Sequence, residues 1–421
     1  MSLWAGGTSC TDVHVDTVII GAGQAGLALS RYLTAAGHEH VMLERGRVGE
    51  RWRSERWDAL RLLTPNWLNR LPGAPPLPDP HAYLDRPALI AHLEAYAASA
   101  PVREHTTVLR VASTRRGYHV ATDRGDWHAS SVVIATGDCD VPRIPASAAA
   151  APPFLHQLHA SRYRRPGQLP KGGVLVVGAG PSGQQIAAEL RRAGRDVVLA
   201  VGRHARMPRT YRGRDVFAWL HDAGQLSVHA DDVPDLAAAR RTPSFPVTGA
   251  RGGESLGVDG LAALGVVVTG RLTGFAGRYA LFAADLDHEL RAADRRMHRA
   301  LGHIDRHIEQ TRAAAAPADV RQPVSLLPGP RSLDLGAGIR TVLWATGFAR
   351  VYPWLEVPVL DAAGELVHRE GVTAAPGLFA LGLRFQRTRK SHFLGGVGED
   401  AAQIAEAILA GSRPARLPHA A

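Results

Sequence analysis

Apolar residues gather in two short runs that each end at a glycine. The first run covers residues 17–20 (TVII) and precedes Gly21, and the second covers residues 174–177 (VLVV) and precedes Gly178. Short runs rich in β-branched residues and bounded by glycine are typical of buried parallel strands. A helix start follows each glycine within a few residues. The chain therefore predicts two copies of a strand, a tight turn and a helix.

Apolar residues also recur at helical spacing over residues 286–312. They step by three or four positions: Leu286, Leu290, Ala293, Met297, Leu301, Ile304 and Ile308. This stripe predicts a long amphipathic helix that either caps a substrate pocket or packs against its own domain, and we expect packing. His303 and His307 lie four residues apart on its polar face, but a metal site needs a third ligand, so we expect no metal. Pro87 predicts the first turn of another helix.

The first glycine turn has the spacing of a dinucleotide site. Gly21, Gly23 and Gly26 form G-x-G-x-x-G, in which the glycines permit a tight turn, backbone approach to a pyrophosphate and close helix–strand packing. The helix start offers unpaired N–H groups and a positive dipole end to the phosphates. The next strand ends in Glu44, where an acidic side chain receives ribose hydroxyls. We predict that this site holds FAD.

The second turn repeats the glycines but not the acid. Gly178, Gly180 and Gly183 have the same spacing, whereas Val201 stands where Glu44 stands in the first copy. Arg203 and His204 follow, with Arg206 close behind. Because an arginine attracts a 2′-phosphate and an acid repels it, we predict NADPH at this site. The alternative is that Arg203 is one more solvated arginine.

An Ala-Thr-Gly sequence follows a strand at residues 135–137 and again at residues 345–347. Such segments are natural places for the chain to pass between domains. We predict an α/β fold with two Rossmann-like dinucleotide-binding domains, in which the NADPH domain is inserted into a discontinuous FAD domain. The predicted parts are FAD domain 1–165, NADPH domain with a helical insertion 166–344, and FAD domain 345–421.

Composition excludes several other classes of protein. The formal net charge is +10, but the arginines are scattered and the only lysines are Lys171 and Lys390, so we expect no nucleic-acid partner. No apolar stretch has the length of a membrane span, and residues 1–16 do not have the pattern of a signal peptide. We therefore expect a cytoplasmic protein that does not bind a membrane, acts on a small molecule and O₂, and possibly forms a homodimer.

The chain resembles the class B flavoprotein monooxygenases, a family that includes flavin-containing monooxygenases, plant auxin-forming enzymes and Baeyer–Villiger enzymes. The resemblance covers nearly the whole length, including both glycine turns, both ATG segments, residues 49–67 and residues 391–408. It implies that Trp52 lies against the flavin and that the backbone of Val108 receives the adenine. It also implies that His392, Leu394 and Asp400 lie near the flavin pyrimidine.

The resemblance implies further site residues. Gln24 and Arg45 belong to the FAD site, and Ser182 matches the family's NADPH turn. The asparagine near the flavin reaction centre corresponds to Asn66, although Pro65 is an alternative match. Residues 207–220 are a candidate region near the nicotinamide or the substrate entrance.

The family's linker fingerprint is matched only in part. His159 and Tyr163 match, whereas Leu155 stands at the glycine position and Pro153 at the phenylalanine position. His159 is either part of the site or a linker residue that fixes the angle between the domains. Tyr163 and Arg164 replace the Trp-Pro of Baeyer–Villiger enzymes, which argues against ketone oxygenation.

The family's reaction implies a role for each cofactor. NADPH reduces FAD, O₂ forms a flavin C4a-hydroperoxide, and this species oxygenates a soft nitrogen or sulfur nucleophile of a small organic substrate. The alternatives are an FAD/NADPH oxidase, an electron-transfer flavoprotein without an oxygenated product, or Baeyer–Villiger chemistry. A disulfide reductase would need a redox-active cysteine pair, whereas Cys10 and Cys139 are far apart and no C-x-x-C occurs.

Overall fold

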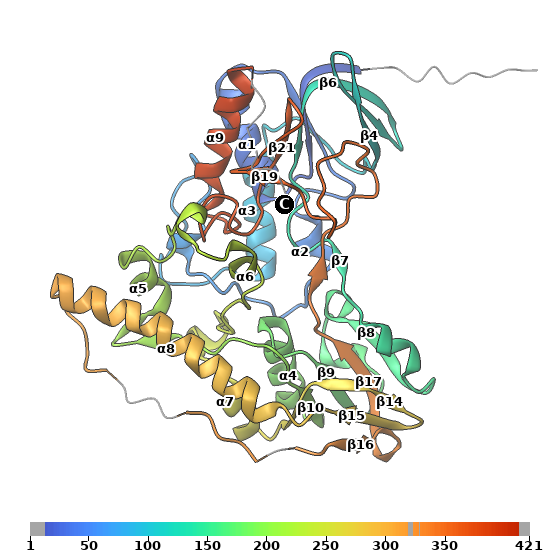
Figure 1. Ribbon diagram of the computed structural model, residues 1–421, viewed down its shortest axis with the longest axis vertical. Coiled ribbons are helices and arrows are strands. Elements are labelled where there is room, and N and C mark those ends of the chain that lie inside the picture. Colours follow the sequence, from blue (N-terminus) through green and yellow to red (C-terminus); the bar gives the residue numbers. More distant parts are fainter. Residues whose placement is uncertain (1–12, 319–322, 328, 412–421) are drawn as a thin grey trace, which may run out of the picture.

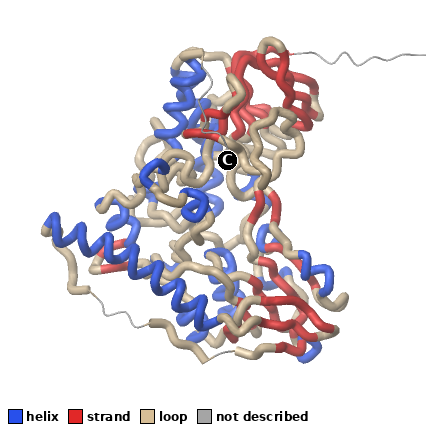
Figure 2. Tube along the Cα trace, viewed as in Figure 1, coloured by secondary structure: helices blue, strands red, loops and turns tan. Residues whose placement is uncertain are grey.

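The protein consists of two α/β halves, each built on its own sheet (Figures 1 and 2). The computed structural model describes residues 13–318, 323–327 and 329–411. Cys10 and most of the N-terminal stretch considered above lie outside the described residues. No helix in these ranges is long and apolar enough to cross a membrane.

The first half is a nine-stranded sheet in the order β19-β20-β21-β6-β1-β2-β3, with β4 and β5 branching from β6. Strand β1 (Val13–Ile20) lies between β2 (His40–Leu43) and β6 (Gly125–Ile134), and both pairings are parallel. The other strands are β3 (Val102–Arg103), β4 (Val108–Thr114), β5 (Gly117–Thr122), β19 (His368–Arg369), β20 (Val372–Thr373) and β21 (Leu378–Ala380). Three helices belong to this half: α1 (Gln24–Ala35), α3 (Arg86–Ala97) and α9 (Val397–Leu409). Side chains of all three join those of β1 in one apolar core.

The second half is a five-stranded parallel sheet in the order β13-β10-β9-β17-β8. Its strands are β8 (His156–His159), β9 (Gly173–Val177), β10 (Val197–Ala200), β13 (Val267–Thr269) and β17 (Ile339–Trp344). Strand β9 lies between β10 and β17 just as β1 lies between β2 and β6, and helix α4 (Pro181–Arg192) follows it. The two predicted strand–turn–helix units are therefore present in equivalent positions of the two sheets.

The second sheet is inserted into the first. Its strands lie in sequence between β6 and β19 of the nine-stranded sheet, which confirms the predicted insertion. The domain boundaries at 165 and 344 stay predictions; β8, which precedes residue 165, pairs within the second sheet. The remaining strands β14 (Leu272–Ala276), β15 (Tyr279–Phe282) and β16 (Ser332–Asp334) form a small antiparallel sheet beside it.

The two connections between the halves run side by side. Strand β7 (Val141–Pro142), after the first ATG, pairs antiparallel with β18 (Phe348–Ala349), after the second ATG. His159 fastens the same place, because its Nε2 lies 3.0 Å from the carbonyl oxygen of Gly347 and its Nδ1 accepts from Ser161 N. The chain thus crosses between the halves at one narrow ribbon (Figure 1).

The predicted long helix is α8 (Leu286–Thr311), which lies across the face of the second half and extends past it (Figure 1). All seven residues of the predicted stripe are buried. Met297, Leu301, Ile304 and Ile308 pack against α5 (Val216–Asp222), so packing is confirmed for this face. The same helix also contributes Arg296, Arg299, Ala300 and His303 to the wall of a cavity.

Candidate functional site

The first glycine turn leaves an open backbone surface beside β1. Gly21 has φ +109°, and a Cβ atom there would lie 2.7 Å from the carbonyl oxygen of Ala135 in the first ATG. A Cβ on Gly26 would lie 2.1 Å from the carbonyl oxygen of Gly21, so helix α1 can approach the turn only with glycine. A Cβ on Gly23 would meet nothing within 4 Å. The turn is closed on the protein side and open at Gly23, as a pyrophosphate site requires.

Glu44 lies at the end of β2 and holds two backbone segments. Its Oε2 accepts from Ala22 N and its Oε1 accepts from Gly46 N, both at 2.9 Å. The carboxylate lines the cavity beside the turn. Each oxygen retains further acceptor capacity, which suits the paired hydroxyls of a ribose.

The second glycine turn repeats this geometry against the second ATG. Gly178 has φ +106°, and a Cβ there would lie 2.5 Å from the carbonyl oxygen of Ala345. A Cβ on Gly183 would lie 1.9 Å from the carbonyl oxygen of Gly178, whereas Gly180 again has no neighbour within 4 Å. Ser182 lies in the first turn of α4. The same glycine-turn backbone is therefore formed twice.

The three basic residues after β10 differ in their freedom to meet a ligand. Arg203 is exposed and makes no ion pair or hydrogen bond with a described residue. His204 is buried, its Nδ1 lies 3.0 Å from the carbonyl oxygen of Gly202, and burial lowers the pKa of its imidazole. Arg206 is bound to Asp294 at 2.6 Å and to Asp259 at 3.3 Å. Of the three, Arg203 is the one that is exposed and has no partner among the described residues, so it is free to meet a ligand.

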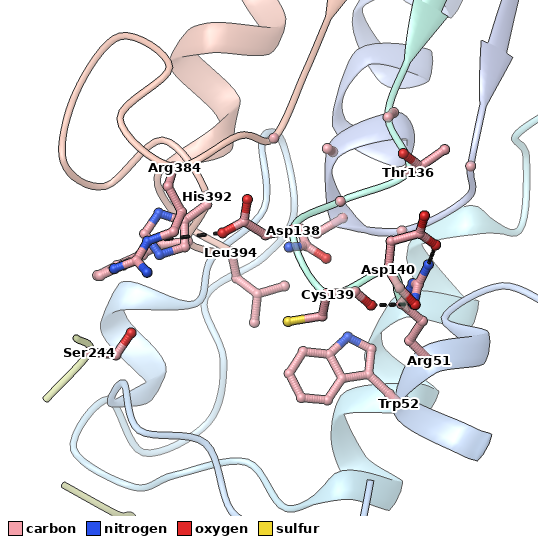
Figure 3. Close-up of a pocket in the computed structure, with 18 of the residues that line it drawn as sticks. Arg51, Trp52, Thr136, Asp138, Cys139, Asp140, Ser244, Arg384, His392 and Leu394 are labelled. Atoms are coloured by element: carbon pink, nitrogen blue, oxygen red, sulfur yellow. Dashed lines mark hydrogen bonds and ion pairs between the residues drawn. The ribbon is translucent and has the colours of Figure 1, made fainter. Parts of the chain in front are cut away.

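A cavity of about 1040 Å³ adjoins the first turn. Half of the predicted site residues line it: Gly21, Gly23, Gln24, Glu44, Arg45, Trp52, Val108, His392 and Leu394. The others lie outside its lining: Gly26, Asn66, Gly178, Gly180, Ser182, Gly183, Arg203, His204 and Asp400. Figure 3 shows Trp52, Cys139, His392 and Leu394 around the same space. The cavity thus joins the first turn to the C-terminal segment, which are far apart in sequence.

The structure does not bring Asn66 into this lining. It begins a short 3-10 helix (Asn66–Leu68), and its Nδ2 donates to the carbonyl oxygens of Pro78 and Asp79. Leu62, Leu63 and Thr64 line the cavity in its neighbourhood. The catalytic role of Asn66 therefore stays a prediction.

His392 and Asp400, which are expected near the flavin pyrimidine, have shifted pKa values. Burial, with the nearby charge of Arg384, lowers the pKa of His392 well below its ordinary range, and its Nδ1 has no partner in the described chain. Burial raises the pKa of Asp400 to about 6, although the side chain of Ser391 acts in the opposite direction. Asp400 is 1% exposed, belongs to α9 and does not line the cavity. His392 is consequently a neutral group facing the cavity.

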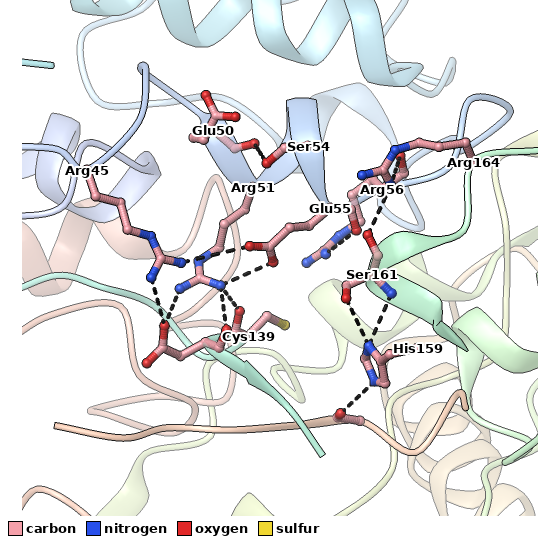
Figure 4. A network of polar contacts seen from close by, with 12 residues as sticks. Arg45, Glu50, Arg51, Ser54, Glu55, Arg56, Cys139, His159, Ser161 and Arg164 are labelled. Atoms are coloured by element: carbon pink, nitrogen blue, oxygen red, sulfur yellow. Dashed lines mark hydrogen bonds and ion pairs between the residues drawn. The ribbon is translucent and has the colours of Figure 1, made fainter. Parts of the chain in front are cut away.

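An ion-pair network holds the loop after the first ATG against α2 (Glu50–Ser54) (Figure 4). Arg51 binds Asp140 at 2.5 Å and Glu55 at 3.2 Å, and it also donates to the carbonyl oxygen of Cys139. Arg45 lies 3.7 Å from the same Asp140 carboxylate. The network fixes Trp52, which lies between Arg51 and Arg53 in sequence, at the cavity wall.

Sequence reasoning offered residues 207–220 as a candidate region near the nicotinamide or the substrate entrance, but it missed Phe245 and Phe393. Phe217 and Leu220, from the candidate region 207–220, line the cavity together with Phe245 and Phe393. The ring centroids of Phe217 and Phe245 are 6.5 Å apart, and those of Phe217 and Phe393 are 6.3 Å apart. Arg209 fastens the region through Asp215 at 2.5 Å and through the ring of Tyr83, whose centroid is 4.4 Å from its Cζ. These rings form an aromatic part of the cavity wall, and the contacts of Arg209 help to hold the segment that carries Phe217.

One group of possible metal-ligating side chains occurs among the described residues, away from the cavity. His229, Asp231 and Glu370 place one ligand atom each within 4.8 Å of one another. His229 Nδ1 already accepts from Asp231 N, its Nε2 lies 3.0 Å from Glu370, and Arg369 lies 3.5 Å from Asp231. These contacts are those of an ion-pair cluster.

Known proteins resemble this chain along most of its length. Residues 18–221 match the family described as pyridine nucleotide-disulphide oxidoreductase. The CzcO-like oxidoreductase of Geobacillus kaustophilus is 32% identical over 400 residues, which cover 94% of this chain and 98% of that protein. An indole-3-pyruvate monooxygenase of Oryza sativa subsp. japonica is 34% identical over 183 residues, covering 42% of this chain and 45% of that protein.

The fold is also found in solved structures. A flavin-containing monooxygenase from Stenotrophomonas maltophilia superposes with a TM-score of 0.64 at 21% identity, covering 94% of this chain and 99% of that chain. This likeness confirms the predicted fold of two dinucleotide-binding domains.

Proposed function

Because the chain belongs to the CzcO-like oxidoreductases and has the fold of a flavin-containing monooxygenase, we propose that it is an NADPH-dependent flavoprotein monooxygenase. It transfers one oxygen atom of O₂ to a nitrogen or sulfur atom of a small organic molecule. The other oxygen atom leaves as water, and one NADPH is oxidised for each product molecule.

The residues around the first turn fit FAD. The open backbone at Gly23 receives the pyrophosphate, Glu44 receives the ribose, and Val108 lies in the wall where the adenine would bind. Trp52, His392 and Leu394 line the part of the same cavity that would receive the ring system. FAD supplies the oxygen-activating chemistry; the protein binds it, orients it and keeps water away.

The second turn fits NADPH. Gly180 leaves the backbone open for the pyrophosphate, and Arg203 is free to bind the 2′-phosphate. The inserted second half would therefore bind the hydride donor. The ribbon of β7 and β18 joins it to the half that would bind the flavin.

The observation that carries the proposal is the continuity of the cavity. A single space runs from Gly23 and Glu44 past Trp52 to an aromatic wall built from α5 and from Phe245 and Phe393. A cavity with one end shaped for a cofactor and another lined by apolar side chains suits a small organic substrate beside the flavin. Cys139 is the single cysteine of the described residues, so they contain no cysteine pair that could accept electrons instead.

The proposal is tested by following oxygen and reducing equivalents together. The FAD-loaded protein is incubated with NADPH, ¹⁸O₂ and, in separate reactions, a thioether, a tertiary amine and a ketone. We expect ¹⁸O in the sulfoxide or N-oxide and a ratio of NADPH oxidised to product near one. Formation of hydrogen peroxide alone with every substrate would favour an oxidase, and an ester product from the ketone would favour Baeyer–Villiger chemistry.

A further inference from the structure

One partly buried cation in the cavity wall has neither an ion pair nor a hydrogen bond to a described residue. Arg389 lines the cavity, and its guanidinium makes no ion pair and no hydrogen bond with a described residue. Its Nε is buried without an acceptor, and its Cζ lies 5.5 Å from the ring centroid of Phe385. Burial lowers the pKa of this guanidinium. A partly buried cation without a partner is costly, which points to a ligand that supplies the missing anion.

The other lining arginines differ from Arg389 in this respect. The engaged ones bind acidic side chains or carbonyl oxygens: Arg45 and Arg51 bind Asp140, Arg206 binds Asp294, Arg56 donates to Glu55 O, Arg296 to His204 O and Arg384 to Thr242 O. Arg299 also has no partner among the described residues, but its side chain is exposed to solvent. Among the partly buried arginines of the lining, Arg389 is therefore the one whose guanidinium has neither an acidic nor a carbonyl partner among the described residues.

Arg389 lies at the aromatic end of the cavity. Its backbone N–H donates to Val228 O at 3.1 Å, which joins its loop to the segment that follows α5. Phe393, four residues further on, contacts Phe217 of α5. On the α8 side, His303 lines the same cavity as Arg389. Burial lowers the pKa of His303, and the charges of Arg306 and Arg389 lower it further. A cation and an apolar wall thus face the same space.

We infer that Arg389 binds the anionic group of the substrate and that the substrate is an organic carboxylate with an apolar body. The body packs against Phe217, Phe245 and Phe393, and its sulfur or nitrogen atom reaches toward the flavin end of the cavity. The identity of this substrate class rests on the proposed function, whereas binding of the anion does not require turnover.

The test compares two thioethers that share a ring and a sulfur atom. Binding of 4-(methylthio)benzoate and of neutral thioanisole to the FAD-loaded protein is measured by equilibrium dialysis at pH 8. We expect the acid to bind at least about tenfold more tightly, because a hydrogen-bonded ion pair in a partly desolvated site contributes this much. In Arg389→Met the two dissociation constants should converge to within about twofold, and Arg389→Lys should restore part of the difference.

Arg299→Met is the matched control, because it removes a cavity-lining charge that is exposed. It should leave the preference for the acid intact. Arg389→Met should also unfold at a temperature no lower than that of the parent protein, since it removes an uncompensated buried charge rather than a structural contact.

Three results would overturn the inference. They are an equal affinity of the parent protein for both thioethers, an equal loss of preference in Arg299→Met, and a raised KM for NADPH in Arg389→Met with the acid preference retained. The last result would assign the cation to the nucleotide. If the acid binds through Arg389 but no oxygenated product forms, the proposed function fails and the anion site stands.

Discussion

Glu44 accepts hydrogen bonds from two backbone N–H groups and is also the proposed ribose ligand. It accepts from Ala22 N and Gly46 N and lines the cavity. We predict that Glu44→Ala raises the dissociation constant for FAD about tenfold to a hundredfold, because a hydrogen bond to a charged group is worth about 1.5–3 kcal/mol. Titration of the apoprotein with FAD, followed by fluorescence, measures the change.

Glu39→Ala is the control for this prediction, because Glu39 is exposed before the start of β2. It should leave the FAD affinity unchanged. An unchanged affinity in Glu44→Ala would show that Glu44 is not a ribose ligand.

Arg203 is expected to determine the choice between NADPH and NADH. We predict that Arg203→Ala raises the KM for NADPH by about tenfold or more and barely alters that for NADH, since only the 2′-phosphate loses its partner. Initial rates of flavin reduction with both nucleotides test this. Arg206→Ala is the comparison, because Arg206 already binds Asp294 and should affect both nucleotides alike. An equal effect of Arg203→Ala on both nucleotides would make Arg203 structural.

The residues that the sequence located are those whose spacing is fixed by local backbone geometry. Gly21, Gly26 and Glu44 belong to one strand–turn–helix–strand unit, so their positions follow from the motif itself. Phe245 and Arg389 come from separate segments that reach the cavity only through tertiary packing, so no spacing in the chain predicts them, and Phe217 was covered only by the broad candidate region 207–220. Asn66 had no such local support, and in the structure it lies outside the cavity lining and donates its amide N–H groups to the carbonyl oxygens of Pro78 and Asp79.

At the scale of single elements, helix α8 was predictable because its stripe alone defines its buried face. One buried residue on that face, Asp294, was not, since an acid there is tolerated only because Arg206 and the N–H of Val324 bind it. Periodicity reports which side of a helix is buried, but it does not report which distant groups satisfy a charge there.

Glu189, on helix α4, makes the stability of the folded protein depend on pH. Burial raises the pKa of Glu189 from 4.5 to about 7, Asp58 adds to this rise, and Tyr163 acts against it. The folded protein therefore binds the proton of the Glu189 carboxyl more tightly than the unfolded chain does. The stabilisation that this proton contributes is complete below pH 4.5 and is lost as the pH rises through 7.

We predict that Glu189→Gln has nearly the stability of the parent protein at pH 4.5 and is more stable by about 1–2 kcal/mol at pH 8, after allowance for partial solvation of the carboxyl. Urea unfolding at the two pH values measures this difference. Glu406→Gln, an exposed change on α9, should show no such divergence. A constant difference between Glu189→Gln and the parent protein at both pH values would exclude Glu189 as the titrating group.

At the scale of the whole molecule, the two halves are held at one angle by the ribbon and by His159. The His159 imidazole is neutral, because burial lowers its pKa, and it bonds Ser161 and Gly347 from its two nitrogens. We predict that His159→Ala costs about 1–3 kcal/mol of stability and raises the ratio of NADPH oxidised to product formed, since the nicotinamide half is then held less firmly. Calorimetry and product analysis measure the two effects.

His156→Ala is the control, because His156 lies at the exposed start of the same strand, β8. It should alter neither quantity. If His159→Ala lowers stability without changing the ratio, His159 supports the linker alone and has no part in coupling.

The pairing of β7 with β18 means that the second half could be exchanged as one block of sequence. Its chain enters and leaves at neighbouring points, so a recombination event that exchanged it between related genes would create two junctions only a few ångströms apart in space. The flavin half would keep every strand of its sheet. Coenzyme preference could then change by the exchange of a whole block during evolution, together with the cavity wall that α5, α8 and Phe245 supply, while Gly23, Glu44 and Trp52 stayed unchanged.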